Sequence, residues 1–300
     1  MYLPRGTLLF LGKGQPAQCQ RGAAGSGLAA KGTHMAYKYG RRPAKNAPAL
    51  RLSRFLAATV PSYPRYEDYL KKLPGWQMLG NDTVGDCNAV TWANMRRLVT
   101  GTLATEYYPT QDQVWEFYRT QNPGFDPAGT ADTNGPGSPQ DQGMDIQTGL
   151  EYLHANGGPD GVKAIAFAKV DPSNLDEVKA ALSIFGGLWL GILVQEANQG
   201  QFHRHENWTD VPGSPVEGGH AILGGGYYTA GVRFITWGRE STFGLSFWDG
   251  SAEGSPLVEE AWVVIWPEQL GNEQFTAGID QAALAADYQA LTGRPLVLGS

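Results

Sequence analysis

The spacing of apolar residues changes near Gly186, and this change limits the folds that the 300-residue chain can adopt. Before Gly186, apolar residues recur every three or four positions, which is typical of amphipathic helices. After Gly186, short apolar runs rich in β-branched and aromatic residues alternate with glycine-rich turns, which is typical of strands. Because helices fill the first half and strands the second, we predict an α+β protein.

Local signals mark the ends of the predicted elements. The first helix begins at Cys87 and ends at Gly101, and Asp86 is suited to cap it because its side chain can accept from the free N–H groups of the first turn. Glycines 224–226 lead from one strand to the next and are interpreted as a turn or bulge. The other helices are predicted at a Thr110 capping box, near Ile146, after a Ser173 cap and after an Asp280 cap, and the strands at 188–194, 220–228, 232–237, 243–248 and 260–266.

Composition along the chain predicts five segments. Residues 1–35 are rich in Gly, Ala, Gln and Ser without periodicity, so we expect a disordered extension, consistent with an upstream start codon. Residues 36–75 are extended, contain several prolines and are predicted to wrap over the surface of a lobe. The helical lobe is assigned to 76–186, the strand-rich lobe to 187–267 and a short tail to 268–300.

Charge and hydropathy argue against several classes of protein. A net charge of −6 gives no basic surface, so nucleic acid is not expected as a partner. No run approaches 18 apolar residues, which argues against a membrane span. The apolar run at 7–11 is shorter than the core of a secretory signal peptide, which favours a cytoplasmic or phage-type soluble protein.

The histidines other than His220 give no firm metal site. His203 and His205 have the spacing of a ligand pair, but Arg204 lies between them and no cluster of cysteines or carboxylates accompanies them, so a solvated loop is expected. His154 is interpreted as the C-terminal cap of a helix. With no phosphate loop or dinucleotide fingerprint either, we expect neither a metal nor another cofactor.

Cys87 and His220 are the residues most suited to chemistry. Cys87 follows a glycine-rich turn and begins a helix, whose free N–H groups and dipole favour a thiolate. His220 lies 133 residues later on a predicted strand between two small residues, which leave room for close approach. A disulfide between Cys87 and Cys19 would join this helix start to the extension, so we expect a free thiol instead. The pair is the arrangement of a nucleophile and its base.

Two residues near Cys87 affect that chemistry. Asn81 lies on the turn before the helix and offers an amide that, with the backbone N–H of Cys87, can hold an oxyanion. Asp86 is a negative charge next to the thiol, and it opposes thiolate formation unless its side chain is turned into the helix cap.

Four features occur in order along the chain. They are Asn81 six residues before Cys87, a glycine-bearing loop and helix at 142–158, Gly219-His220-Ala221-Ile222 with Gly226-Tyr227, and Thr236-Trp237-Gly238. Together these features resemble the papain-like cysteine peptidases over residues 76–266. The resemblance implies a helical lobe packed on an antiparallel, barrel-like lobe, with a cleft between them where Cys87 and His220 hydrolyse a peptide or protein substrate, and we expect the chain to be a monomer.

The chain departs from this pattern at Ile235, where the family carries the asparagine that orients the histidine. Thr236 is the nearest polar residue, but alternation along a strand turns it away from the face of Ile235. Thr236 can therefore orient His220 only if the strand is bulged there. Otherwise the site is a Cys–His dyad, which we favour, or it is degenerate.

Two other interpretations remain open. Peptidoglycan amidases of the NlpC/P60 and CHAP type also place a cysteine at a helix start before a strand histidine, and Asp86-Cys87 resembles their motif, although their Cys–His separation is usually shorter. The third interpretation is a catalytically weak or inactive papain-like module that binds a peptide or protein. Ile235 and Asp86 favour it.

Overall fold

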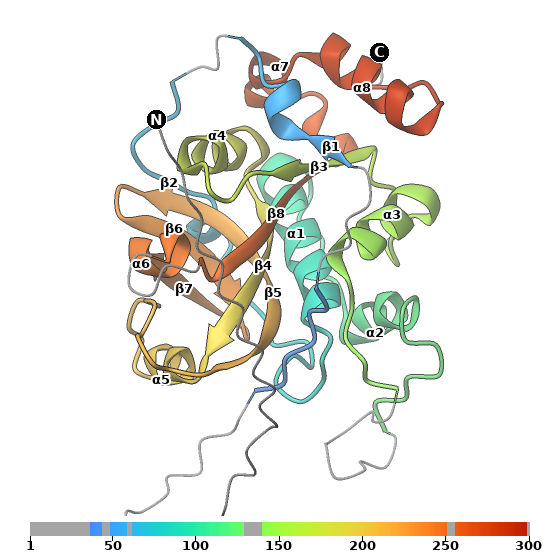
Figure 1. Ribbon diagram of the computed structural model, residues 1–300. Helices are drawn as coiled ribbons and strands as arrows, with labels where there is room; N and C mark the ends of the chain where they lie inside the picture. Colours follow the sequence, from blue (N-terminus) through green and yellow to red (C-terminus); the bar gives the residue numbers. More distant parts are fainter. Residues whose placement is uncertain (1–36, 44–48, 59–61, 129–139, 251–255, 299–300) are drawn as a thin grey trace, which may run out of the picture. The chain divides into compact units, whose positions relative to one another are not determined.

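The computed structural model describes residues 37–43, 49–58, 62–128, 140–250 and 256–298 (Figure 1). The predicted extension at 1–35, with Cys19, lies outside the described residues. The helices described are α1 (Cys87–Leu103), α2 (Gln111–Arg119), α3 (Ile146–Asn156), α4 (Leu175–Phe185), α5 (Glu196–His203), α6 (Leu245–Asp249), α7 (Glu273–Gly278) and α8 (Gln281–Thr292), with short 3-10 turns η1 (Leu52–Arg54), η2 (Leu70–Lys72) and η3 (Pro267–Gln269).

One mixed sheet contains all the described strands. Its order is β1-β3-β8-β4-β5-β6-β7, with β2 pairing on β5, and only the β1–β3 pair is parallel. Because this order is linear, the sheet is open and the barrel-like closure that we expected is not formed. The strands are β1 (Leu50–Arg51), β2 (Glu67–Asp68), β3 (Ala166–Val170), β4 (Leu188–Gln195), β5 (Val216–Tyr228), β6 (Gly231–Thr236), β7 (Arg239–Gly244) and β8 (Val258–Ile265).

The sheet separates two apolar cores. Along β4, Trp189 joins the core around α1, whereas Leu188 and Leu190 join the core on the opposite face with residues of α4. This alternation is the two-residue period of a strand buried on both faces. Helix α1 packs against β5, β4 and α2 (Figure 1). The α+β fold predicted from the sequence is therefore confirmed.

Most predicted helices form where local signals placed them. Helix α2 begins with the Thr110 capping box, and α8 begins after an Asp280 cap, as predicted. Helix α4 is capped by Asn174, whose side chain accepts from the N–H of Glu177, and not by Ser173. None of the helices in the described ranges combines the length and the apolar character that a bilayer span requires.

The predicted strand at 243–248 is wrong. Strand β7 ends at Gly244, and α6 follows it and ends at Gly250 in the left-handed conformation. The helix buries Phe247 and Trp248 in the core beside α4. A short aromatic run can be buried by a helix or by a strand, and its period alone does not separate the two.

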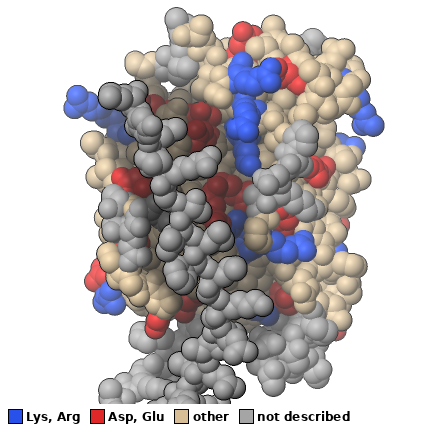
Figure 2. Space-filling model, viewed as in Figure 1, with Lys and Arg blue, Asp and Glu red and all other residues tan. Residues whose placement is uncertain are grey.

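Three more elements differ from those expected, and the charged side chains can be seen on one face. Strand β3 comes from the range assigned to the helical lobe, and α5 and α7 were not predicted. On the face seen in Figure 2, acidic and basic side chains of the described residues both occur, with red groups beside blue ones.

Candidate active site

Cys87 is the first residue of α1, and its thiol is fully buried and free of any disulfide. The backbone N–H of Ala221 donates to its sulfur across 3.4 Å. Because Ala221 follows His220 on β5, the helix start and the strand that carries the histidine meet at the thiol. The structure thus brings the two halves of the predicted pair together.

His220 is fully buried, and its two ring nitrogens have different surroundings. Nε2 lies 2.7 Å from Oγ1 of Thr236. Nδ1 has no hydrogen-bond partner. The ring stacks on Trp237, with centroids 4.9 Å apart and planes inclined by 28°. One nitrogen is therefore held by a hydroxyl, and the other remains available.

The Thr236 hydroxyl reaches His220 because of a β-bulge in the neighbouring strand. The register of β5 against β6 shifts at Gly225, so that beyond the shift Leu223 lies opposite Ile235. Both of those side chains join the core beside α1, and Thr236 shares the other face with His220. A one-residue shift moves every side chain to the opposite face. The sequence made this contact conditional on a bulge in the strand of Thr236, but the bulge lies in β5, within the glycine run interpreted as a turn or bulge.

The turn after Thr236 holds backbone in an uncommon conformation. Trp237 has φ 45° and Gly238 has φ 70°, which joins β6 to β7 by a two-residue hairpin with two positive φ values. A Cβ at Gly238 would lie 3.0 Å from the backbone nitrogen of Met78. Positive φ at a bulky residue is strained, and such strain gathers at functional sites. Here it sets the indole of Trp237 against His220.

Asp86 occupies the N-cap position of α1, but its side chain makes no capping hydrogen bond, so our expectation of a side-chain cap is wrong. The side chain is fully buried, and neither carboxyl oxygen has a hydrogen-bond partner. Burial, with the nearby charge of Asp141, raises the pKa of Asp86 well above its ordinary value. Burial thus weakens the opposing charge next to the thiol without removing it, because Asp86 still acts to raise the pKa of Cys87.

Asn81 lies buried on the turn that leads to Cys87. Its backbone N–H closes that turn on the carbonyl of Met78, and Leu79 and Gly80 between them have φ 53° and φ 88°. The side-chain oxygen Oδ1 has no hydrogen-bond partner. The amide that we predicted to hold an oxyanion is therefore on the expected turn and is not tied up through Oδ1.

Residues 37–43, which we call the covering segment, run between two walls of this site, one at Gly219 and the other at Met144. On one wall, the backbone N–H of Arg41 donates to the carbonyl of Gly219 across 3.0 Å. On the other, the N–H of Met144 donates to the carbonyl of Gly40 across 2.7 Å, within a parallel bridge between Arg41 and Met144. The segment is held on both sides as a strand would be.

The covering segment lies directly on the thiol. The N–H of Gly40 faces the Cys87 sulfur. A Cβ at Gly40 would lie 1.8 Å from the carbonyl oxygen of Gly85, and one at Gly143 would lie 2.0 Å from that of Gly40. We expected residues 36–75 to wrap over a lobe surface, but this part fills the space between the walls. Gly40, Gly85 and Gly143 are visible in the sequence, but only the fold shows that they lie in contact.

The covering segment also sets the charge states of the pair. Burial raises the pKa of the Cys87 thiol to about 11, although the N–H groups of Ala221 and Gly40 act in the opposite direction. Burial, followed by the charge of Arg41, lowers the pKa of His220 to about 3. Near neutral pH both side chains are therefore uncharged in the covered form.

His203 and His205 make contacts with other side chains. His203 ends α5 and stacks on Tyr37, and His205 lies 3.2 Å from the guanidinium of Arg239. Among the residues that the structure describes, no group of three or more His, Cys, Asp or Glu side chains could hold a metal ion.

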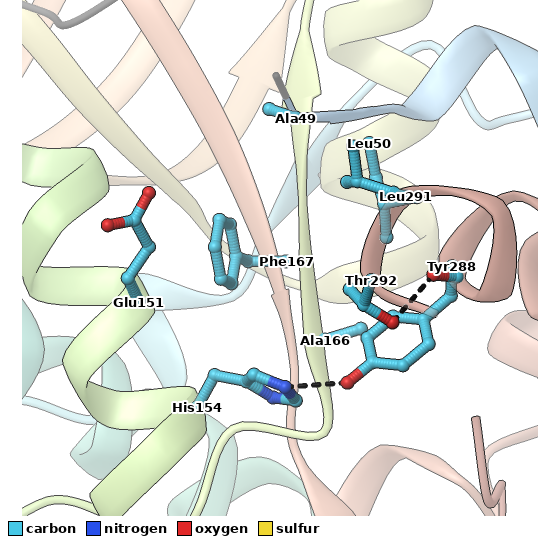
Figure 3. Close-up of a pocket in the computed structure, with 9 residues that line it drawn as sticks. All are labelled: Ala49, Leu50, Glu151, His154, Ala166, Phe167, Tyr288, Leu291 and Thr292. Carbon is cyan, nitrogen blue, oxygen red and sulfur yellow. Dashed lines mark hydrogen bonds between the residues drawn. The ribbon is translucent and has the colours of Figure 1, made fainter. Parts of the chain in front are cut away.

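A separate cavity of about 370 Å³ lies between α3, β1, β3 and α8 (Figure 3). In it, Nδ1 of His154 bonds the carbonyl of Ala164, and Nε2 bonds the hydroxyl of Tyr288. His154 is thus not the helix cap that we expected, because Gly157 ends α3. Apolar side chains form most of the remaining lining, and neither Cys87 nor His220 contributes to it.

Comparisons with known proteins agree with this fold. No protein-family model and no curated protein sequence matches the chain. Among solved structures, it is similar to xylellain, a cysteine protease from Xylella fastidiosa, with a TM-score of 0.54 and 15% identity over 76% of this chain and 96% of that one. Procathepsin B S9 from Trypanosoma congolense also matches, with a TM-score of 0.47 and 11% identity over 76% of this chain and 86% of that one. The resemblance expected from the sequence is therefore confirmed as a papain-like fold.

Proposed function

We propose that this chain is a cysteine-type peptidase in a covered, latent form. One observation carries the proposal: the thiol at the start of α1 contacts the strand of His220, whose Nε2 is held by Thr236 while Nδ1 is free. This is the arrangement of an activated nucleophile, its base and a third group that orients the base. The papain-like fold supports it.

In the proposed reaction, Nδ1 of His220 takes the proton of the Cys87 thiol. For this, Nε2 must carry the other ring proton and donate it to Thr236 Oγ1, which fixes the tautomer. The thiolate then adds to the carbonyl carbon of the peptide bond. When the C–N bond breaks, His220 returns the proton to the leaving amine, and water hydrolyses the thioester with His220 again acting as base.

The oxyanion formed at the carbonyl needs donors placed in advance. The backbone N–H of Cys87 is one of the free donors of the first turn of α1. We assign the second donor to the side-chain amide of Asn81 on the preceding turn. Loss of one such donor commonly costs about 10²–10³ in kcat.

Catalysis in this proposal requires that the covering segment leave the site. A thiol covered by Gly40 cannot meet a substrate, and an uncharged pair is poorly reactive. When the segment leaves, water reaches the pair and the charge of Arg41 moves away from His220, so the pKa of His220 rises. The same displacement thus opens and activates the site.

Hydrolysis of unfolded casein by the full-length chain and its Arg41→Ala variant tests the proposal. We expect Arg41→Ala to be the more active, because one anchor of the covering segment is lost. Adding Cys87→Ala or His220→Ala should reduce hydrolysis to background, and the double substitution should cost no more than either alone. Hydrolysis that survives Cys87→Ala would rule the proposal out.

A second candidate is a papain-like module that binds peptides without cleaving them. The full burial of the thiol, with its raised pKa, is the observation that favours it. Labelling with a thiol-reactive peptide epoxide separates the two. In the Arg41→Ala variant, a peptidase should lose its Cys87 thiol rapidly at neutral pH, whereas a binding module should react no faster than a small-molecule thiol. The amidase alternative rests on the Asp86-Cys87 motif, and the described part of the structure adds no observation that favours it.

A further inference from the structure

The side chain of Arg41 leaves the covering segment and enters a charged pocket. One guanidinium nitrogen lies 2.9 Å from Oε1 of Glu260, and another bonds Oε2 of Glu259. The Arg41 side chain is only 2% exposed. We call the site formed by Gly191, Gly219, Glu259 and Glu260 the arginine pocket.

Two glycines give the arginine pocket its room. A Cβ at Gly191 would lie 2.9 Å from Cδ of Arg41 and 2.5 Å from Cγ of Glu260. A Cβ at Gly219 would lie 2.7 Å from the backbone oxygen of Arg41 and 3.2 Å from its Nε. Any larger residue at either position would fill space that the arginine now takes. The pocket is thus shaped for a long side chain that arrives along the path of the covering segment.

Glu260 is the buried acidic group of the arginine pocket. Its side chain is 1% exposed, and its second oxygen accepts from Nε1 of Trp262 across 3.0 Å. Glu259, at 41% exposed, lies at the rim. If Arg41 leaves, Glu260 keeps a neutral donor and water takes the place of its counter-charge. A substrate that covers the pocket again removes this water. A cationic side chain then restores the counter-charge, whereas an apolar side chain buries the carboxylate without one, which is costly.

The covering segment also shows where this cation lies relative to the bond that is cut. Gly40 faces the thiol, and Tyr39 before it packs edge-on against His220 at 5.9 Å. Because His220 must protonate the leaving amine, the side of Tyr39 is the side of the leaving group. Arg41 lies on the other side of Gly40, where the acyl part of a substrate stays attached to Cys87.

We infer that the arginine pocket selects peptides with arginine at the residue immediately before the one whose carbonyl is attacked. This inference rests on the proposed peptidase function, and Arg41 occupies the place of that substrate arginine. The planar guanidinium meets both carboxylates at once, which a lysine ammonium cannot match. Arginine should therefore be preferred to lysine, and lysine to an uncharged residue.

Three dipeptide amides of aminomethylcoumarin test the selectivity, with acetyl-Arg-Ala, acetyl-citrulline-Ala and acetyl-Leu-Ala as acyl parts. The enzyme is the full-length Arg41→Ala variant. Citrulline keeps the shape of arginine without its charge, so we expect kcat/KM to favour arginine over citrulline by about 10- to 100-fold. Glu260→Gln in the same background should lower this ratio about 10-fold, and Glu259→Gln at the exposed rim should lower it less. An arginine to citrulline ratio near one, or a ratio that survives Glu260→Gln, overturns the inference.

Binding without catalysis separates this inference from the proposed function. In the full-length Cys87→Ala, Arg41→Ala variant, fluorescein-labelled Arg-Ala peptide should bind about 10-fold more tightly than its citrulline counterpart. Discrimination in binding without hydrolysis by the Cys87 protein would sustain the pocket and refute the peptidase. Hydrolysis of all three amides at similar rates would sustain the peptidase and refute the pocket. If Glu260→Gln fails to fold, Glu259→Gln and the citrulline ratio decide the matter.

Discussion

Arg41 and Arg96 are equally buried, each with 2% of its side chain exposed, and each meets two carboxylates. Arg96 lies within α1, where its Nε bonds Asp160 and its two terminal nitrogens bond Glu268. Its guanidinium also stacks over Trp266 at 4.5 Å. Every side-chain nitrogen of Arg96 thus has a hydrogen-bond partner, and these partners belong to fixed parts of the fold.

Arg41 lies on a segment without a helix, which is joined to Gly219 by one backbone hydrogen bond and to Met144 by two, and its Nε has no partner. Its partners Glu259 and Glu260 belong to β8, which β4 separates from β5 in the sheet. The contrast indicates that a buried arginine paired with two carboxylates serves two different purposes in this protein. Arg96 holds parts of the body together, whereas Arg41 is seated as a ligand would be and can be replaced.

The largest effect that separates the two arginines should be on global stability. Arg96→Met leaves Asp160 and Glu268 without their cation, and breaking a buried pair in this way costs about 3–5 kcal/mol of unfolding free energy. Arg41→Met should cost much less, because the covering segment can leave and let water solvate Glu260. Thermal unfolding followed by circular dichroism should show a fall in Tm of about 10 °C for Arg96→Met. Equal falls for both variants would show that Arg41 is structural too.

The next largest effect should come from Thr236, which belongs to the fixed body like Arg96 but acts on catalysis. Thr236→Val keeps the shape and leaves the Nε2 proton of His220 without an acceptor, so the productive tautomer and rotamer become less populated. We expect kcat to fall about 10²-fold, the order of a general-base contribution. Thr236→Ser keeps the hydroxyl and should retain most of the activity. An unchanged kcat in Thr236→Val would leave a Cys–His dyad, which we favoured from the sequence.

The sequence could predict the elements whose signals are local. Helix α1 was placed at Cys87 by a glycine-rich turn and helical spacing, and α2 by a capping box that the structure contains. The aromatic run that ends at Trp248 was wrongly predicted as a strand, because such a run can be buried equally well by a strand or by a helix. The raised pKa of Asp86 was also missed, since its main cause is burial, which is a property of the assembled fold.

The candidate site was predictable in part for the same reason. Cys87 and His220 were found because their residue types and separation are visible along the chain. The contact of Thr236 depends on counting one extra residue at Gly225 in another strand, which alternation within its own strand cannot show. The position of Arg41 depends on pairing across more than a hundred residues.

A third effect is the loss of stability of the covered form at acid pH. His220 titrates with a pKa of about 3 in the covered form, below its ordinary 6.5, mainly because it is buried. The open form binds the extra proton between these values, so the stability of the covered form is complete above pH 6.5 and falls as pH drops toward 3. The loss is about 1.4 kcal/mol per pH unit at most. Hydrogen exchange at the Arg41 and Met144 amides, corrected for intrinsic rates, should lose up to tenfold protection per unit between pH 6 and 4.

A non-titrating side chain provides the control for this acid effect. In His220→Gln, protection of the Arg41 amide should lose this component of its pH dependence, and the difference between the two proteins isolates the imidazole from nearby carboxylates such as Glu260. Amides of α1, which are not bonded to the covering segment, should stay protected in both proteins. Equal pH dependence in the wild-type protein and His220→Gln would mean that another group controls the opening.

The smallest effect should come from Lys38, a second residue that joins the covering segment to its surroundings by an ion pair. Its Nζ lies 2.6 Å from Oδ2 of Asp141, and its side chain is 25% exposed, against 2% for Arg41. A partly solvated ion pair of this kind contributes about 1 kcal/mol or less. Asp141 would also remain satisfied without Lys38, because it accepts hydrogen bonds from Tyr118 and from the backbone of Gly85. Lys38→Met should therefore speed epoxide labelling of Cys87 by no more than about fivefold, well below the increase in Arg41→Met. Labelling as fast as in Arg41→Met would show that the segment is held by its charges in general and not by the arginine pocket.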